Sequence, residues 1–187
     1  MVNKLIDQYE CPYDIILLQF IDTHIELYKD ISPNTITTIG ILFGLLSAYN
    51  ISHANFRFAA ILFLIAYYLD CVDGKVARKY NKVTLFGDYY DHISDMLKYI
   101  VISYSLYQSD NQRFIELSYI LVIMLLVLMV HFGCQEKIYN KDISHTIGLF
   151  KYIIPDKVDH CKLIEYTRFC GNGTLIFILF LSIYFWK

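Results

Sequence analysis

Two pairs of aspartates stand where long apolar runs of this sequence meet. Asp70 and Asp73 are three residues apart, and Asp91 and Asp95 are four residues apart. Either spacing places both carboxylates on one face of a helix. A short connection makes consecutive helices neighbours, so the four carboxylates can converge on one pocket. Acids at the edge of a membrane span are costly, and a cluster of them needs cations.

The apolar runs predict an all-α integral membrane protein. Hydrophobic residues make up 56% of the 187 residues and charged residues only 18%. A membrane-spanning helix needs about 20 mostly apolar residues. Five segments are predicted to span, and one of them is included although the second aspartate pair lies in its first half, because its polar residues cluster at that end. They are residues 36–51, 56–78, 87–107, 114–132 and 170–186. The partly apolar segment 145–154 is too short to span and is interpreted as interfacial or re-entrant, so the bundle has five to six spans.

Two regions are expected. Residues 1–32 form an amphipathic N-terminal helix region, in which Leu18, Ile21 and Ile25 recur at three- and four-residue steps between charged residues. This helix lies on the membrane surface or packs against the other helices. Residues 33–187 form the transmembrane catalytic domain. The N-terminus has no apolar core typical of a cleaved signal peptide, and the five cysteines lack the spacing of a disulfide framework or a zinc site.

The distribution of basic residues predicts the topology. One set of connecting segments holds most of the lysines and arginines, whereas the opposite set holds only Arg57, Arg113 and Lys187. The positive-inside rule then places the N-terminus and the aspartates on the cytosolic side.

The residues around the aspartates indicate a phosphorylated substrate. Oxygen-only ligands favour Mg²⁺ or Mn²⁺, and four carboxylates have room for two ions, an arrangement suited to displacement at phosphorus. Arg78 offers a planar fork for a phosphate. Gly74 and Gly87 have no side chain and Ala77 has only a methyl group, so that a bulky group can approach the backbone. Together these residues predict a diphosphate substrate.

The same residues form a recognisable signature, Asp70-x2-Asp73-Gly74-x2-Ala77-Arg78-x8-Gly87-x3-Asp91-x3-Asp95. This resembles the motif of the CDP-alcohol phosphotransferases, the class-I CDP-alcohol phosphatidyltransferase family, with every fixed position present. Upstream, Pro33-Asn34-x2-Thr37 is similar to a family segment that helps hold the cytidine nucleotide. The resemblance implies an enzyme that moves a phospho-alcohol group from a CDP-linked donor to an alcohol and releases CMP. It also implies that one substrate is a lipid and that the enzyme is a homodimer. Independently of the resemblance, the formal net charge of -2 does not suggest nucleic acid as a partner.

The resemblance also implies roles for individual residues. Asp70, Asp73 and Asp91 would bind the metal ions. Asp95 would lie at the same centre and act as general base on the acceptor hydroxyl, so that Asp91 and Asp95 form the catalytic pair. The CDP moiety would be held by Asn34, Thr37, Gly74, Ala77, Arg78 and Gly87.

Different residues of these motifs point to different substrate classes. Lys75, Asn81 and His92 resemble the choline and ethanolamine phosphotransferases, whose acceptor is diacylglycerol, and we favour this class. Thr84 and Gly87 are closer to enzymes that use CDP-diacylglycerol with inositol, serine or glycerol phosphate, which is the alternative. Two other classes of protein are also compatible with the four aspartates, a cation transporter and a non-catalytic membrane scaffold. The positively charged Arg78 argues against the transporter, because a pathway for cations has no use for it.

Four basic residues are candidate contacts for the acceptor or a lipid head group: Lys75, His92, Lys98 and Arg168. Lys98 stands three residues after Asp95, on the carboxylate face. It is expected to pair with Asp95 or contact a lipid phosphate, with snorkelling to the interface as the other possibility.

Overall fold

The computed structural model describes residues 9–139 and 147–186, and this part of the chain contains helices and no strand. The predicted all-α class is therefore confirmed. In chain order the elements are α2 (Pro12–His24), η1 (Ile25–Tyr28), α3 (Pro33–Ser52), α4 (Phe56–Lys79), α5 (Leu85–Ser109), α6 (Asn111–Tyr139), η2 (Ile147–Ile153), α7 (His160–Thr167), η3 (Arg168–Cys170) and α8 (Asn172–Tyr184). Here η denotes a 3-10 helix.

The chain divides into two compact units. One comprises Met1–Gln19 and Ile120–Leu175, and the other comprises Phe20–Tyr119 and Ile176–Lys187. Their borders fall inside α2, α6 and α8. The predicted division after residue 32 is a different one and stays a prediction.

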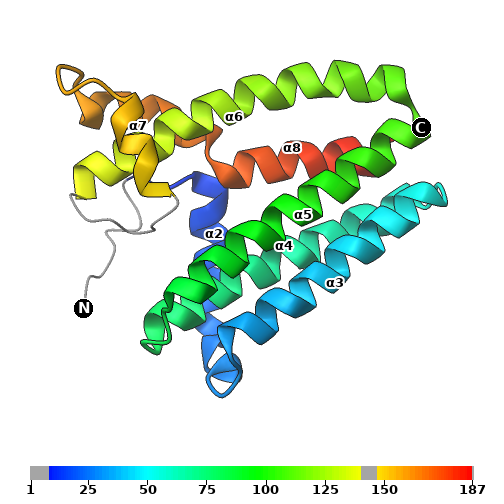
Figure 1. The fold of residues 1–187 in the computed structure, drawn as a ribbon, viewed down its shortest axis with the longest axis horizontal. Helices are drawn as coiled ribbons and strands as arrows, with labels where there is room; N and C mark the ends of the chain where they lie inside the picture. Colours follow the sequence, from blue (N-terminus) through cyan, green and yellow to red (C-terminus); the bar gives the residue numbers. More distant parts are fainter. Residues whose placement is uncertain (1–8, 140–146, 187) are drawn as a thin grey trace. The chain divides into compact units, whose positions relative to one another are not determined.

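The second unit is built on α3, which packs along both α4 and α5 (Figure 1). Ser32 caps its start by accepting a hydrogen bond from the Thr35 N–H (3.1 Å), and Pro33 occupies the first turn. The buried face of α3 carries small residues, among them Gly40, Gly44 and Ser47. The Ser47 hydroxyl reaches the Ala59 carbonyl of α4 (2.8 Å). Small side chains therefore allow α3 and α4 to approach each other closely.

A tight turn joins α4 to α5. The helix α4 runs through Gly74 without a break, as expected. Asn81 then adopts a left-handed conformation (φ 54°), which asparagine tolerates better than most residues. The helix α5 begins at Leu85, two residues before the predicted start at Gly87, because Thr84 accepts the Gly87 N–H (3.0 Å) as its cap.

The first unit contains most of the C-terminal half. The helix α6 extends from Asn111 to Tyr139, well beyond the predicted 114–132. The predicted last span begins at Asn172 rather than at residue 170, after the short helices α7 and η3. Of the 145–154 segment, 147–153 form the 3-10 helix η2, too short to span, and 145–146 lie outside the described residues.

Three described segments are long and apolar enough to cross a membrane, namely Pro33–Ser52, Asn111–Ile138 and His160–Tyr184. The helices α4 and α5 have 24 and 25 residues and match these spans in length. Their aspartates and lysines lower the hydropathy, so composition alone does not select them. The protein is thus a membrane protein, while the number of spans and their orientation stay predictions. Lys187 and residues 1–8 lie outside the described part.

Candidate metal centre and active site

Three of the four aspartates meet in one cluster between α4 and α5. One carboxylate oxygen each of Asp70, Asp91 and Asp95 lies within 4.8 Å of the other two. Asp70 comes from the C-terminal half of α4, and the other two come from the first half of α5. The convergence expected from the two spacings is therefore found for these three.

Asp73 is not part of this cluster and instead forms a hydrogen bond with α3. Its side chain is buried, and its Oδ2 accepts a hydrogen bond from the Thr37 hydroxyl at 2.5 Å. The same hydroxyl lies 3.1 Å from the Pro33 carbonyl. Thr37, expected to contact CDP, thus orients a carboxylate of the signature. Because a hydroxyl has only one proton, it cannot donate to both oxygens at once.

A buried lysine bridges two of the clustered carboxylates. The Lys98 ammonium nitrogen lies 2.9 Å from Asp70 Oδ1 and 2.6 Å from Asp95 Oδ1. Only 6% of Lys98 is exposed. Pairing with Asp95 is one of the expected alternatives and is observed, whereas the contact with Asp70, across the two helices, was not predicted.

The lysine has room only because Gly44 of α3 lacks a side chain. A Cβ at Gly44 would lie 2.7 Å from the Lys98 Cγ and 3.1 Å from its Cδ. Side-chain carbons do not approach so closely. This contact between Gly44 and Lys98 was not predicted. The four-residue step from Gly40 to Gly44 was the only available signal.

The donor set fits a hard divalent cation. Asp91 Oδ1 is buried and has no hydrogen-bond partner among the described residues. A buried carboxylate oxygen without a partner is costly, and a cation would satisfy it. The neighbouring ligands are also carboxylate oxygens, which suit Mg²⁺ or Mn²⁺. The cluster therefore has the chemistry of a metal site.

Arg78 and two glycines lie near this cluster in the sequence and shape its surroundings. The exposed Arg78 folds back so that a Cβ on Gly74 would lie 3.1 Å from its Nη2. A Cβ on Gly87 would lie 3.0 Å from Thr84 Oγ1 and 3.3 Å from Asn34 Oδ1. Glycine at 74 thus leaves the guanidinium free to lie along α4, and glycine at 87 brings Asn34 of α3 close to the start of α5.

Two candidate acceptor contacts have other partners. Lys75 forms an ion pair with Asp22 of α2. His92 Nδ1 donates to the Asp88 carbonyl one turn earlier (2.7 Å). One turn beyond Lys75, the Lys79 ammonium binds Glu26 of η1 at 2.9 Å, and this hydrogen bond lowers the pKa of Glu26. These contacts attach the N-terminal segment to α4.

Arg168 belongs to the other unit. It lies in η3, with its guanidinium 5.8 Å from the centre of the Phe169 ring. Its predicted head-group contact stays a prediction.

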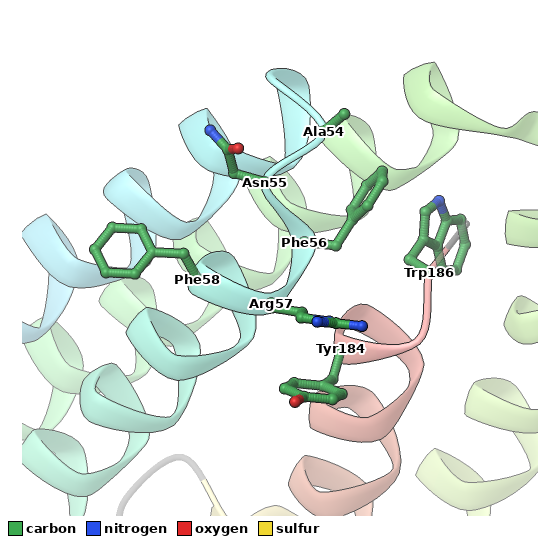
Figure 2. Close-up of a pocket in the computed structure, with 7 residues that line it drawn as sticks. All are labelled: Ala54, Asn55, Phe56, Arg57, Phe58, Tyr184 and Trp186. Atoms are coloured by element: carbon green, nitrogen blue, oxygen red, sulfur yellow. The ribbon is translucent and has the colours of Figure 1, made fainter.

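A cavity of about 500 Å³ opens at the opposite end of α4 from the aspartates. It is lined by residues 54–58 of the α3–α4 connection together with Tyr184 and Trp186. Figure 2 shows the Arg57 guanidinium above the Tyr184 ring, 5.8 Å from its centre. The aspartate cluster and this cavity are separate features of the same unit.

Comparisons with curated proteins find partial matches to lipid-synthesising enzymes. The chain is 39% identical over 67 residues to archaetidylinositol phosphate synthase of Pyrococcus horikoshii, covering 36% of each protein. It is 38% identical over 82 residues to CDP-diacylglycerol–glycerol-3-phosphate 3-phosphatidyltransferase of Rickettsia felis, covering 42% of this chain and 45% of the relative. The enzyme of the same name from Rickettsia typhi is 42% identical over 55 residues, 29% of this chain and 31% of the relative. Each match spans less than half of the relative's length.

These names favour the CDP-diacylglycerol alternative over the choline and ethanolamine class that we favoured from the motifs. No solved structure matches the chain. The CDP-alcohol phosphatidyltransferase family matches it over residues 30–184, a range that contains the aspartate cluster, Thr37 and Lys98. With most of its length matched and the signature intact, this chain belongs to the CDP-alcohol phosphatidyltransferase family.

Proposed function

We propose that this protein transfers a phosphatidyl group from CDP-diacylglycerol to a hydroxyl of a polar acceptor and releases CMP. The observation that carries the proposed chemistry at phosphorus is the cluster of Asp70, Asp91 and Asp95, in which one buried oxygen of Asp91 has no hydrogen-bond partner among the described residues. The Rickettsia relatives, by name, use CDP-diacylglycerol and glycerol 3-phosphate, and the Pyrococcus relative makes archaetidylinositol phosphate. A phosphorylated polyol is therefore the acceptor class we favour.

In this proposal Asp95 is the general base. The acceptor oxygen attacks the phosphorus that carries the diacylglycerol, the bond from that phosphorus to the CMP oxygen breaks, and Asp95 takes the hydroxyl proton. A hydroxyl is a weak nucleophile at neutral pH, so a carboxylate within hydrogen-bond reach supplies what the attack needs. Asp70, Asp73 and Asp91 are the proposed ligands for Mg²⁺ or Mn²⁺. A divalent cation held by these carboxylates would stabilise the negative charge that develops in the reaction.

The donor is proposed to bind beside the signature glycines. Arg78 offers two parallel N–H groups to a phosphate, and its exposure leaves it accessible. Asn34 and Gly87 lie close together, where the first turns of α3 and α5 meet. We propose that the nucleotide binds there, where the small residues Gly74, Ala77 and Gly87 leave space for it. Exposed apolar side chains on the same helices, such as Leu42, Ile61 and Ile93, suit the acyl chains of the lipid.

The residues behind the choline and ethanolamine interpretation have structural explanations. Lys75 pairs with Asp22, Asn81 forms the left-handed turn, and His92 donates to a carbonyl of its own helix. Thr84, which suggested the CDP-diacylglycerol class, is likewise the cap of α5. Neither set therefore decides the donor, and the comparisons carry that choice.

A donor screen tests the proposal. Purified protein in detergent with Mg²⁺ is given CDP-diacylglycerol and glycerol 3-phosphate, inositol phosphate, inositol or serine in turn. Parallel arms contain CDP-choline or CDP-ethanolamine with diacylglycerol. CMP release only with CDP-diacylglycerol supports the proposal. Release only in the parallel arms would move the enzyme to the aminoalcohol class, and no release in any arm would support a non-catalytic scaffold. Chemical crosslinking of the same preparation tests the implied homodimer.

A further inference from the structure

Three of the four signature carboxylates have a polar or charged partner from the protein itself. Thr37 donates to Asp73, and the Lys98 ammonium contacts both Asp70 and Asp95. At Asp91, the buried Oδ1 has no partner among the described residues. Of these four carboxylates, Asp91 is therefore the one with a buried oxygen that is left for a cation to bind.

We propose that Lys98 is a resident cation that takes the place of one divalent ion, so that the substrate-free protein binds a single ion, at Asp91. This inference rests on the proposed function only in treating the cluster as a divalent-cation site. It concerns how many ions the site holds, and not which reaction follows.

The position of Lys98 supports this role. Its nitrogen lies within 3 Å of one oxygen of Asp70 and one of Asp95, so a second ion that bridged these two oxygens would have to displace it. Two positive charges at such a separation also repel strongly in a poorly solvated place. Lys98 thus opposes a second ion both by occupying its ligands and by its charge.

The packing around Lys98 keeps the ammonium there. Gly44 of α3 lies against the Lys98 stem, where a Cβ would be only 2.7 Å from Cγ. The side chain is almost fully buried, so it does not extend along the helix toward water as a snorkelling lysine does. An ammonium that is enclosed in this way is a fixed part of the site.

Binding of Mn²⁺ to the detergent-solubilised full chain, measured by equilibrium dialysis and by the signal of free Mn²⁺ in electron paramagnetic resonance, tests the inference. We expect one tightly bound ion per wild-type chain, and loss of that ion in Asp91→Asn. Lys98→Met and Lys98→Gln remove the charge and should bind a second ion at least 10-fold more tightly than wild type. Lys79→Met, which removes a lysine that pairs with a single exposed carboxylate, should leave the wild-type stoichiometry.

Two equally tight ions in the wild type would overturn the inference, and this measurement needs no variant to fold. Unchanged stoichiometry in a folded Lys98→Met or Lys98→Gln chain would overturn it as well. CMP release measured on the same preparations separates the two proposals. An active wild type with two equal ions contradicts the resident cation alone, whereas one ion without CMP release from any donor contradicts the enzymatic function alone.

Discussion

Gly44 of α3 lies directly against the side chain of Lys98 of α5, and this contact places the lysine ammonium between Asp70 and Asp95. A methyl group at position 44 would meet Lys98 Cγ at 2.7 Å, so the lysine stem would have to move. The geometry of the carboxylates thus depends on a residue of a third helix that carries no functional group.

Gly44→Ala is therefore expected to lower both stability and activity. Overpacking of this kind costs about 1–3 kcal/mol, and the shifted ammonium would no longer bridge the two aspartates. Thermal unfolding in detergent and CMP release measure the two effects. The control is Gly40→Ala on the same helix face, where the nearest atoms to a new Cβ are at 3.6 and 3.7 Å, an ordinary contact. Equal behaviour of the two alanine variants would contradict this account of Gly44.

Thr37→Val is expected to weaken divalent-cation binding. The substitution keeps the shape of the side chain but removes the donor to Asp73 Oδ2 and leaves that buried oxygen unsatisfied. A lost hydrogen bond to a charged group costs about 1.5–3 kcal/mol, and loss of an orienting partner typically reduces metal affinity by about 10- to 100-fold. Titration of activity against Mn²⁺ should show a higher half-saturating concentration.

The neighbouring threonine provides the control for this experiment. The exposed Thr38 hydroxyl bonds to the Tyr90 hydroxyl (2.9 Å) and donates to the Asn34 carbonyl (2.7 Å), and neither partner is one of the four aspartates. Thr38→Val should therefore keep the Mn²⁺ dependence of the wild type. A shift of similar size in both variants would indicate a general effect on α3 rather than a specific role of the Thr37 hydroxyl.

The sequence predicts well what depends on spacing within one helix. The pairing of Asp95 with Lys98 and the shared face of Asp91 and Asp95 follow from local helix geometry, and both are found. Contacts between helices depend on how each helix is rotated against its neighbour. No pattern in the sequence states that rotation, so the bridge from Lys98 to Asp70 and the contact with Gly44 were missed.

The same reason explains why the motif did not reveal the protein partners of residues that were assigned to substrate. Thr37 was expected to contact CDP and orients Asp73, while Lys75 was expected near the acceptor and pairs with Asp22. A motif records which residue types occur at which spacing, and it does not separate a residue that touches substrate from one that holds a neighbour. The position of Asp22 relative to α4 follows only from the packed structure.

The ion pair between Glu26 and Lys79 should make a small, pH-dependent contribution to stability. The hydrogen bond from Lys79 lowers the pKa of Glu26 below its ordinary value of 4.5. A carboxylate with a lowered pKa in the folded state stabilises the fold above its unfolded-state pKa, and this contribution is lost as pH falls through the folded-state value. Glu26→Gln should thus unfold at a slightly lower temperature than wild type at pH 7, and the difference should vanish in acid.

Salt provides an independent check on this pair. Both side chains are well exposed, so 0.5 M NaCl should shrink the difference between wild type and Glu26→Gln at pH 7. A difference that is insensitive to both pH and salt would show that Glu26 stabilises η1 by packing rather than by charge.

Asp95→Asn separates the role of base from the role of ligand. An asparagine keeps the shape of the side chain but cannot accept the proton of the acceptor hydroxyl, and loss of general-base catalysis costs typically about 10²- to 10⁴-fold in rate. We expect CMP release to fall by this factor while binding of CDP-diacylglycerol, followed by isothermal titration calorimetry in detergent, stays near the wild-type value. Asp91→Asn should instead lose Mn²⁺ binding, because it removes charge at the carboxylate whose buried oxygen has no partner among the described residues. If Asp95→Asn also abolished donor binding, Asp95 would act mainly as a metal ligand and another group would have to take the proton.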